Sequence, residues 1–246
     1  MVANKKFIII FILTILSSHI VYSENRDTYT VPHKEELFSY ENETFGGFSL
    51  LYRKAELNQT DGSDGIVVIY LHGGSGQGED NQSQLMTNAV SDIYNYLKSN
   101  NIKTVILAPQ APYGHQWTGD LMSAVKGLSD EYSGNGDKKV YILGGSMGGY
   151  GVWNLLTAYR GYFAGAMPVA CNTPRRSPEN YLNTRIISVV GRNDFKRDIE
   201  AVKYFFEELS ELGGEVGVDI EDNWNHRQTS EYSFTPERLD RLFGKK

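Results

Sequence analysis

The chain has 246 residues and a formal net charge of -6 at pH 7, with 30 acidic against 24 basic side chains. This acidic balance argues against binding to nucleic acids or to anionic membrane surfaces, which attract basic patches. Cys171 is the single cysteine, so an intrachain disulfide is excluded and the fold must rest on its hydrophobic core. We expect Cys171 itself to be a small buried residue.

Residues 1–23 differ in composition from the rest of the chain. Lys5 and Lys6 precede an apolar run over 7–16, and residues 21–23 offer a cleavage site. This pattern predicts a signal peptide that is removed on export. An uncleaved membrane anchor is the alternative, although the apolar run is short for spanning a bilayer. We therefore predict a secreted or periplasmic protein in which 24–246 form one domain, with no stable membrane association after signal removal.

From Phe48 onward, short apolar runs alternate with longer amphipathic stretches. This alternation predicts an α/β fold with a mostly parallel central sheet and helices on both faces. Residues 24–47 are predicted as an edge hairpin or an extended lead-in, and no connection is long enough for a large lid. The predicted strands span 48–53, 66–71, 104–108, 140–143, 163–169, 186–190 and 216–220, and the predicted helices span 82–98, 121–132, 148–159 and 198–212.

A G-x-S-x-G motif, Gly144-Gly145-Ser146-Met147-Gly148, lies between a predicted strand and a predicted helix. In that context the motif predicts a sharp turn that exposes a nucleophilic serine at the carboxyl end of the sheet. The two outer glycines leave room for the neighbouring strand and helix. A glycine-rich turn with an incidental serine is the alternative, and it is disfavoured because the other parts of a catalytic triad follow in order.

A second glycine loop, His72-Gly73-Gly74, follows the strand over 66–71 and is suited to presenting backbone N–H groups to an oxyanion. We predict the amides of Met147 and Gly74 as donors, with Gly73 a close competitor. His72 precedes the nucleophile and is interpreted as a brace for this loop. A phosphate-binding loop is the rival interpretation, but no Lys-Ser or Lys-Thr pair follows it.

The acid and the base are predicted from chain order. Asp194 follows the strand over 186–190, with Asp198 as the nearest substitute, although Asp198 is better explained as the start of a helix. His226 is the only histidine after Asp194, which gives the order Ser, Asp, His. In the predicted mechanism, His226 takes the proton of Ser146 and Asp194 orients the imidazole.

The segments 71–81, 84–85 and 108–112, followed by Trp117, accompany this triad. Together, over roughly 66–226, they resemble the secreted esterase and predicted-peptidase branch of the α/β-hydrolases, which includes phospholipase/carboxylesterase-like, feruloyl and acetylxylan esterase-like enzymes. The resemblance implies carboxylic ester hydrolysis by a compact domain without a cofactor, and it places the Trp117 loop beside the active-site cleft. The sequence shows no cluster of metal ligands, so we expect no metal. Trp117 is therefore a candidate substrate contact, with ordinary packing as the alternative.

Trp224, two residues before the base, is a second candidate for the pocket wall. The segments Phe195-Lys196-Arg197 and Arg227-Gln228 depart from the pattern of this branch, so the substrate is less well defined than the triad. The leading hypothesis is an exported esterase acting on small-molecule or polysaccharide-linked acyl esters, with the polysaccharide suggested by analogy. A peptidase or thioesterase with the same triad is the second hypothesis, and a non-catalytic binding protein is the third. The oligomeric state stays open.

Overall fold

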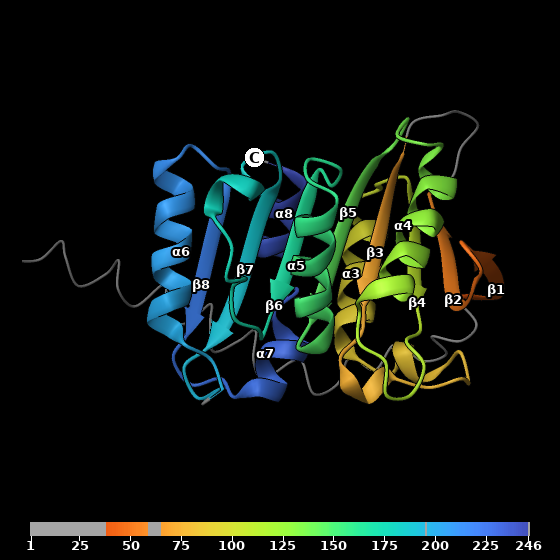
Figure 1. The fold of residues 1–246 in the computed structure, drawn as a ribbon, viewed down its shortest axis with the longest axis horizontal. Helices are drawn as coiled ribbons and strands as arrows, with labels where there is room; N and C mark the ends of the chain where they lie inside the picture. The colour runs from red at the N-terminus through yellow and green to blue at the C-terminus, as the bar shows by residue number, and fades with distance from the viewer. Residues whose placement is uncertain (1–37, 59–64, 195, 246) are drawn as a thin grey trace, which may run out of the picture. The chain divides into compact units, whose positions relative to one another are not determined.

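The structure is a computed structural model that describes residues 38–58, 65–194 and 196–245. The predicted signal peptide lies outside these residues. Within them, one eight-stranded sheet has the order β1-β2-β4-β3-β5-β6-β7-β8, with helices on both faces (Figure 1). Its strands are β1 (Ser39–Phe45), β2 (Phe48–Leu57), β3 (Ile66–Leu71), β4 (Thr104–Pro109), β5 (Lys139–Gly145), β6 (Gly165–Val169), β7 (Arg185–Gly191) and β8 (Val216–Glu221).

Strand directions in the sheet are mixed at one edge only. β2 pairs antiparallel with both β1 and β4, and the pairings from β4 through β3 and β5 to β8 are all parallel. Gly46 and Gly47 form the turn between β1 and β2, with φ angles of 58° and 86° that favour glycine. The described part of the predicted lead-in is thus an edge hairpin.

Helices α4 (Gly119–Ser133), α5 (Met147–Ala158) and α6 (Ile199–Glu211) cover one face of the sheet. The opposite face carries α3 (Asn88–Ser99), α7 (His226–Tyr232) and α8 (Pro236–Phe243). Single turns of 3₁₀-helix occur at η2 (Gly74–Gly76), η3 (Ser83–Leu85) and η4 (Pro178–Tyr181). None of the helices in the described part of the chain is long and apolar enough to cross a membrane.

The predicted helix over 82–98 is wrong at its start. The side chain of Thr87 accepts a hydrogen bond from the backbone N–H of Ala89 at 3.3 Å, so it caps α3 and the helix begins at Asn88. Residues 80–87 instead form a loop that contains the 3₁₀ turn η3. In that loop the backbone N–H of Asn81 donates to Oε1 of Gln110 at 2.7 Å.

The sheet separates two hydrophobic cores, and consecutive residues of β3 alternate between them. Val67, Ile69 and Leu71 pack toward α4 and α5, whereas Val68 and Tyr70 pack toward α3 and α8. This alternation explains why the central strands are apolar on both faces. In the described residues between β6 and β7 the only helical element is η4.

Candidate active site

Ser146 lies at the turn between β5 and α5, in a conformation that few residues other than glycine adopt. Its φ and ψ angles are 57° and −115°, and its backbone N–H donates to the carbonyl oxygen of Val169 at 3.0 Å. A Cβ atom at Gly148 would lie 1.9 Å from the carbonyl oxygen of Leu71, and one at Gly144 would lie 2.7 Å from the backbone of Gly148. These contacts confirm that the outer glycines of the motif leave room for the neighbouring strand and helix.

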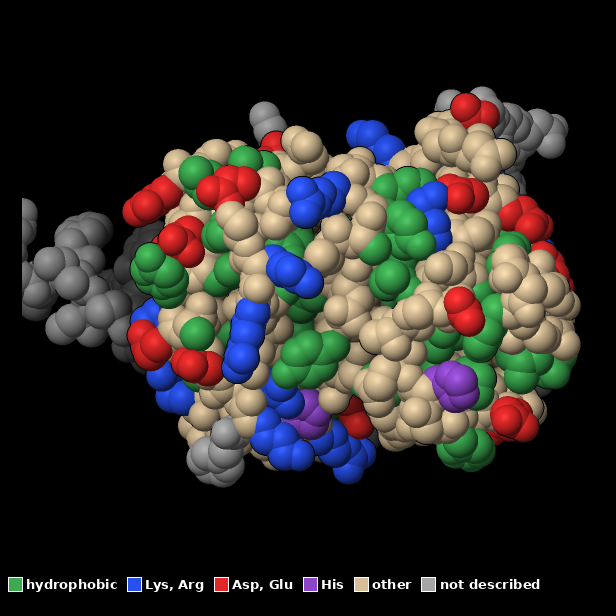
Figure 2. Space-filling model, viewed as in Figure 1, with side chains coloured by type: hydrophobic (Ala, Val, Ile, Leu, Met, Phe, Trp, Pro, Cys, Tyr) green, Lys and Arg blue, Asp and Glu red, His purple; other side chains and the backbone are tan. Residues whose placement is uncertain are grey.

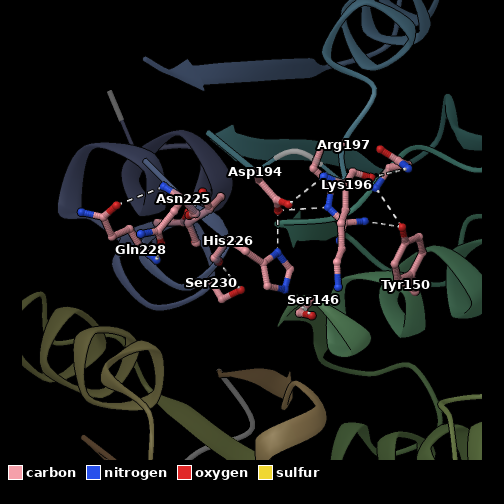
Figure 3. A network of polar contacts seen from close by, with 12 residues as sticks. Ser146, Tyr150, Asp194, Lys196, Arg197, Asn225, His226, Gln228 and Ser230 are labelled. Carbon is pink, nitrogen blue, oxygen red and sulfur yellow. Dashed lines mark hydrogen bonds and ion pairs between the residues drawn. The ribbon is translucent and has the colours of Figure 1, made fainter. Parts of the chain in front are cut away.

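His226 is the first residue of α7, and its imidazole lies within hydrogen-bonding distance of Ser146. Nε2 of His226 is 2.8 Å from Oγ of Ser146 (Figure 3). A capping box begins the helix: the Asn225 side chain accepts from the backbone N–H of Gln228, and the Gln228 side chain accepts from that of Asn225, both at 3.0 Å. The helix start therefore fixes where the histidine lies.

Asp194 follows β7, and its buried carboxylate lies on the other side of the imidazole. Oδ2 of Asp194 is 2.5 Å from Nδ1 of His226. Burial raises the pKa of this carboxyl group, but hydrogen bonds from His226 and Arg197 outweigh burial, so the net pKa lies below its usual range. The structure thus brings together the three side chains predicted as a triad. Asp198 instead caps α6 by accepting from the backbone N–H of Ala201 at 3.0 Å.

Arg197 is a component of this site that sequence reasoning did not identify. Its Nε donates to Oδ2 of Asp194 at 3.0 Å, and Nη1 donates to the hydroxyl of Tyr150 at 2.5 Å. The guanidinium carbon also lies 5.7 Å from the centroid of the Tyr150 ring. Only 7% of the Arg197 side chain is exposed, so its charge interacts with Asp194 with little screening by solvent.

The two predicted oxyanion donors lie at the ends of different elements. Met147 is the first residue of α5, so its N–H has no carbonyl partner within the helix. Gly74 begins η2, and the adjacent Gly73 lies close to the nucleophile, since a Cβ at Gly73 would be 3.6 Å from Cβ of Ser146. The glycine loop therefore adjoins Ser146 as predicted. The choice of the Gly74 amide over that of Gly73 stays a prediction.

His72 braces this loop through both ring nitrogens. The backbone N–H of Ala111 donates to Nε2 at 2.9 Å, so the proton must be on Nδ1, which donates to the carbonyl oxygen of Gly73 at 2.6 Å. Burial lowers the pKa of His72 to about 4, which keeps the ring neutral. The interpretation of His72 as a structural histidine is confirmed.

The prediction of Trp117 as a substrate contact is corrected by its burial. Only 1% of Trp117 is exposed, and its Nε1 donates to the carbonyl oxygen of His72 at 3.1 Å. Its ring also packs edge-on against the His72 ring, with centroids 5.0 Å apart. The loop of Trp117 does adjoin the glycine loop. The indole itself belongs to the core, where it contacts the ring and the carbonyl oxygen of His72.

Trp224 is partly buried, and its ring packs against side chains of α7 and α8. It contacts Tyr232 of α7 edge-on with centroids 6.3 Å apart, and the guanidinium of Arg238 lies 5.5 Å from the ring centroid. These contacts favour packing over a pocket wall. Cys171 is buried as predicted, and burial raises the pKa of its thiol to about 12. No group of three potential metal-ligating side chains occurs among the described residues.

Comparison with known proteins supports the architecture seen here. Neither a family model nor a curated protein sequence matches the chain. Among solved structures, a thermostable esterase is 20% identical with a TM-score of 0.70, over 85% of this chain and 63% of the esterase. The chain has the α/β-hydrolase fold. An esterase from Pyrococcus furiosus shares this fold at 18% identity and a TM-score of 0.58, over 85% of this chain and 95% of that one.

The α/β-hydrolase fold is also shared with a peptidase. An acylaminoacyl peptidase from Pyrococcus horikoshii is 14% identical with a TM-score of 0.55, over 83% of this chain and 40% of the peptidase. The chain therefore spans less than two thirds of both the thermostable esterase and the peptidase. At these identities the likeness concerns the fold, so the reaction has to be argued from the site itself.

Proposed function

We propose that the chain is a serine hydrolase that cleaves carboxylic esters through an acyl-enzyme intermediate. The observation that carries this proposal is the continuous hydrogen-bonded series from Oγ of Ser146 through His226 to the carboxylate of Asp194, with distances of 2.8 and 2.5 Å. The strained backbone of Ser146 and the adjoining glycine loop support the same role.

The hydrogen bonds assign the proton positions. A carboxylate held ionised can only accept, so Nδ1 of His226 carries the ring proton and donates a hydrogen bond to Asp194. Nε2 is then unprotonated and accepts the hydroxyl proton of Ser146 as Oγ attacks the carbonyl carbon of the ester. Asp194 stabilises the imidazolium that forms, without taking its proton.

The negative charge that develops on the carbonyl oxygen of the ester must be stabilised by hydrogen-bond donors. In the proposed mechanism the amide of Met147 supplies one, assisted by the N-terminal end of α5, and the amide of Gly74 supplies the other. The imidazolium then protonates the leaving alcohol. Water, activated by the same histidine, hydrolyses the acyl-enzyme and restores Ser146.

The first experiment compares hydrolysis by the wild-type protein, Ser146→Ala and Ser123→Ala on a substrate panel. The panel contains 4-nitrophenyl acetate, butyrate and octanoate, methyl ferulate, acetylated xylan, a thioester and an aminoacyl 4-nitroanilide. Ser123 is an exposed serine on α4 and is the matched control. We expect ester turnover that falls at least about a thousandfold in Ser146→Ala and is retained in Ser123→Ala.

The same panel decides the substrate class. Turnover of acetylated xylan would support an ester on a polysaccharide, and the proposed export as a secreted or periplasmic enzyme agrees with such an external substrate. The fold shared with an acylaminoacyl peptidase makes amide cleavage the second candidate. Turnover of the anilide alone would favour that peptidase. Absence of turnover, together with failure of a fluorophosphonate probe to label Ser146, would contradict a hydrolase and favour a binding protein.

A further inference from the structure

The loop that follows Asp194 is held in place at several points; we call its described residues 194 and 196–198 the rim loop. The backbone N–H of Arg197 donates to the carbonyl oxygen of Asp194 at 2.9 Å. The backbone N–H of Asp198 donates to Oδ1 of Asn172 at 2.9 Å. With the Arg197 side chain held by Asp194 and Tyr150, the rim loop is fixed between the triad and the first turn of α5.

Lys196 lies in the middle of this fixed loop. Its backbone N–H donates to Oδ1 of Asp194 at 3.3 Å, and its carbonyl oxygen accepts from Nδ2 of Asn172 at 3.4 Å. The residue is exposed, and Figure 3 shows its side chain running from the rim loop toward Ser146. The backbone contacts fix the point from which this side chain leaves the rim loop, and its ammonium group takes no part in the hydrogen-bonded triad.

The charge of Lys196 is not neutralised within the described part of the chain. No ion pair among the described residues includes Lys196, whereas the neighbouring cations Arg192 and Arg227 are paired with Asp222 and Glu231. The carboxylate of Asp194 is buried and already accepts from His226 and Arg197. The ammonium group of Lys196 thus keeps its capacity to bind an anion.

Charge is distributed unevenly over the surface around this loop. Figure 2 shows a band of Lys and Arg side chains that crosses one face over β6 and β7 and reaches α7, while acidic side chains on this face lie mainly over α6 and near β1. The whole chain carries a net charge of -6, so the positive band is a local feature of the face that holds the site. A local positive potential favours the approach of anions.

Tyr150 adds an aromatic surface next to this charge. It lies one helical turn after Ser146, with its N–H donating to the Ser146 carbonyl oxygen at 3.1 Å. Its hydroxyl accepts from Arg197, and 39% of the residue is exposed. An exposed ring and an unpaired ammonium group on one rim suit a planar group that bears a negative charge.

We propose that Lys196 and Tyr150 form a subsite for a carboxylate-bearing aryl group, so that the preferred substrates are anionic esters. This inference rests on the proposed ester hydrolase activity and specifies its substrate class. Lys196 acts as a specificity residue: its ammonium group attracts the substrate carboxylate, and the ring of Tyr150 contacts the aryl plane. The reaction is ordinary ester hydrolysis, in which water adds across the acyl C–O bond and releases an acid and a phenol.

A pair of isosteric esters tests the proposal. The sodium salt of 4-acetoxybenzoic acid and the neutral 4-acetoxybenzamide differ in charge but hardly in shape, and both release acetate. The quantity measured is the ratio of kcat/KM for the anion to kcat/KM for the amide, compared between variants because the two phenols differ as leaving groups. The variants are Lys196→Met, which removes the charge and keeps the chain length, and Lys196→Glu, which reverses the charge.

The matched control is Lys139→Met, because Lys139 is an exposed lysine at the opposite end of β5 from Ser146. We expect the ratio to fall about three- to fivefold in Lys196→Met, the size typical of a partly exposed ion pair, and about tenfold in Lys196→Glu. The wild-type ratio should also fall with added salt, since salt screens exposed charges. Lys139→Met should keep the wild-type ratio.

Other outcomes overturn the inference in distinguishable ways. An unchanged ratio in Lys196→Met, including an equal loss on both esters, would mean that Lys196 does not recognise the substrate charge, although the ester hydrolase proposal would stand. An equal fall of the ratio in Lys139→Met would mean that the preference for the anionic ester depends on the net charge of the protein and not on Lys196. If the wild type hydrolysed neither these esters nor any ester of the first panel, the proposed function and this inference would fail together.

Discussion

Arg197 and His226 donate hydrogen bonds to the same oxygen, Oδ2 of Asp194, at 3.0 and 2.5 Å. A buried cation therefore shares the carboxylate that orients the proposed base. Its charge offsets part of the negative field that Asp194 exerts on the imidazole. The guanidinium also helps to hold the pKa of the Asp194 carboxyl below its usual range, which keeps the carboxylate ionised beside Nδ1 of His226.

We expect Arg197→Gln to lower kcat about tenfold, because Asp194 loses a charge-assisted hydrogen bond and the rim loop loses its contact with Tyr150. Arg197→Lys should restore part of the loss, and Arg160→Gln, at an exposed arginine that follows α5, should keep the wild-type kcat. An unchanged kcat in Arg197→Gln would mean that the guanidinium does not position Asp194.

The burial of His72 predicts acid-sensitive stability. Its pKa in the folded protein, about 4, lies below its usual value of 6.5, so the unfolded chain binds the proton more tightly. The free energy of unfolding should therefore be highest above pH 6.5 and fall by about 3 kcal/mol as the pH drops to 4. Denaturant titrations across this range measure the slope. His72→Gln should lose most of it and the exposed His115→Gln should keep it, whereas equal slopes in both would contradict the assignment.

The close packing of the serine turn predicts that Gly148→Ala does not fold normally. Its Cβ would lie 1.9 Å from the carbonyl oxygen of Leu71, and backbone at both positions would have to move. We expect a loss of more than about 3 kcal/mol, or no soluble protein. Gly74→Ala is the control, because its Cβ meets nothing within 4 Å, and should lose less than about 1 kcal/mol. Circular dichroism during chemical denaturation measures both, and a stable Gly148→Ala would show that the turn is looser than its geometry indicates.

The Cys171 thiol should be inert in the folded protein. It is buried, and its pKa of about 12 leaves almost no thiolate at pH 8. We expect Ellman's reagent to react with the native protein far more slowly than with the protein in guanidinium, where one equivalent should react. Because the chain has a single cysteine, the signal belongs to Cys171 alone. Rapid reaction of the native protein would mean that the β6 end opens readily.

The sequence predicted the features that depend on local pattern. Apolar runs located the parallel strands, with β3 predicted at its observed bounds, 66–71, and glycines at fixed spacing identified the turn at Ser146. Chain order then separated His226 from the other histidines. These inferences succeeded because strand burial and turn geometry are imposed over a few neighbouring residues.

What the sequence did not predict depends on contacts between distant segments. Trp117 is buried because it donates to the carbonyl oxygen of His72, 45 residues earlier, and no local pattern records that contact. Helix α7, which begins with the base, and the following α8 were not predicted, since they are only 7 and 8 residues long. Arg197 was noted only as a departure from a familiar pattern, because its role depends on Tyr150 reaching it from α5.

The capping box at Asn225 has a consequence for how the protein would lose activity. His226 is the first residue of a 7-residue helix, and helix ends fray more readily than sheet interiors. Fraying of that first turn would withdraw the base from Ser146 while the sheet and both cores stayed intact. On mild heating, activity should therefore disappear before the bulk of the fold melts. Faster hydrogen exchange at the Gln228 amide would mark the temperature at which the first turn of α7 frays.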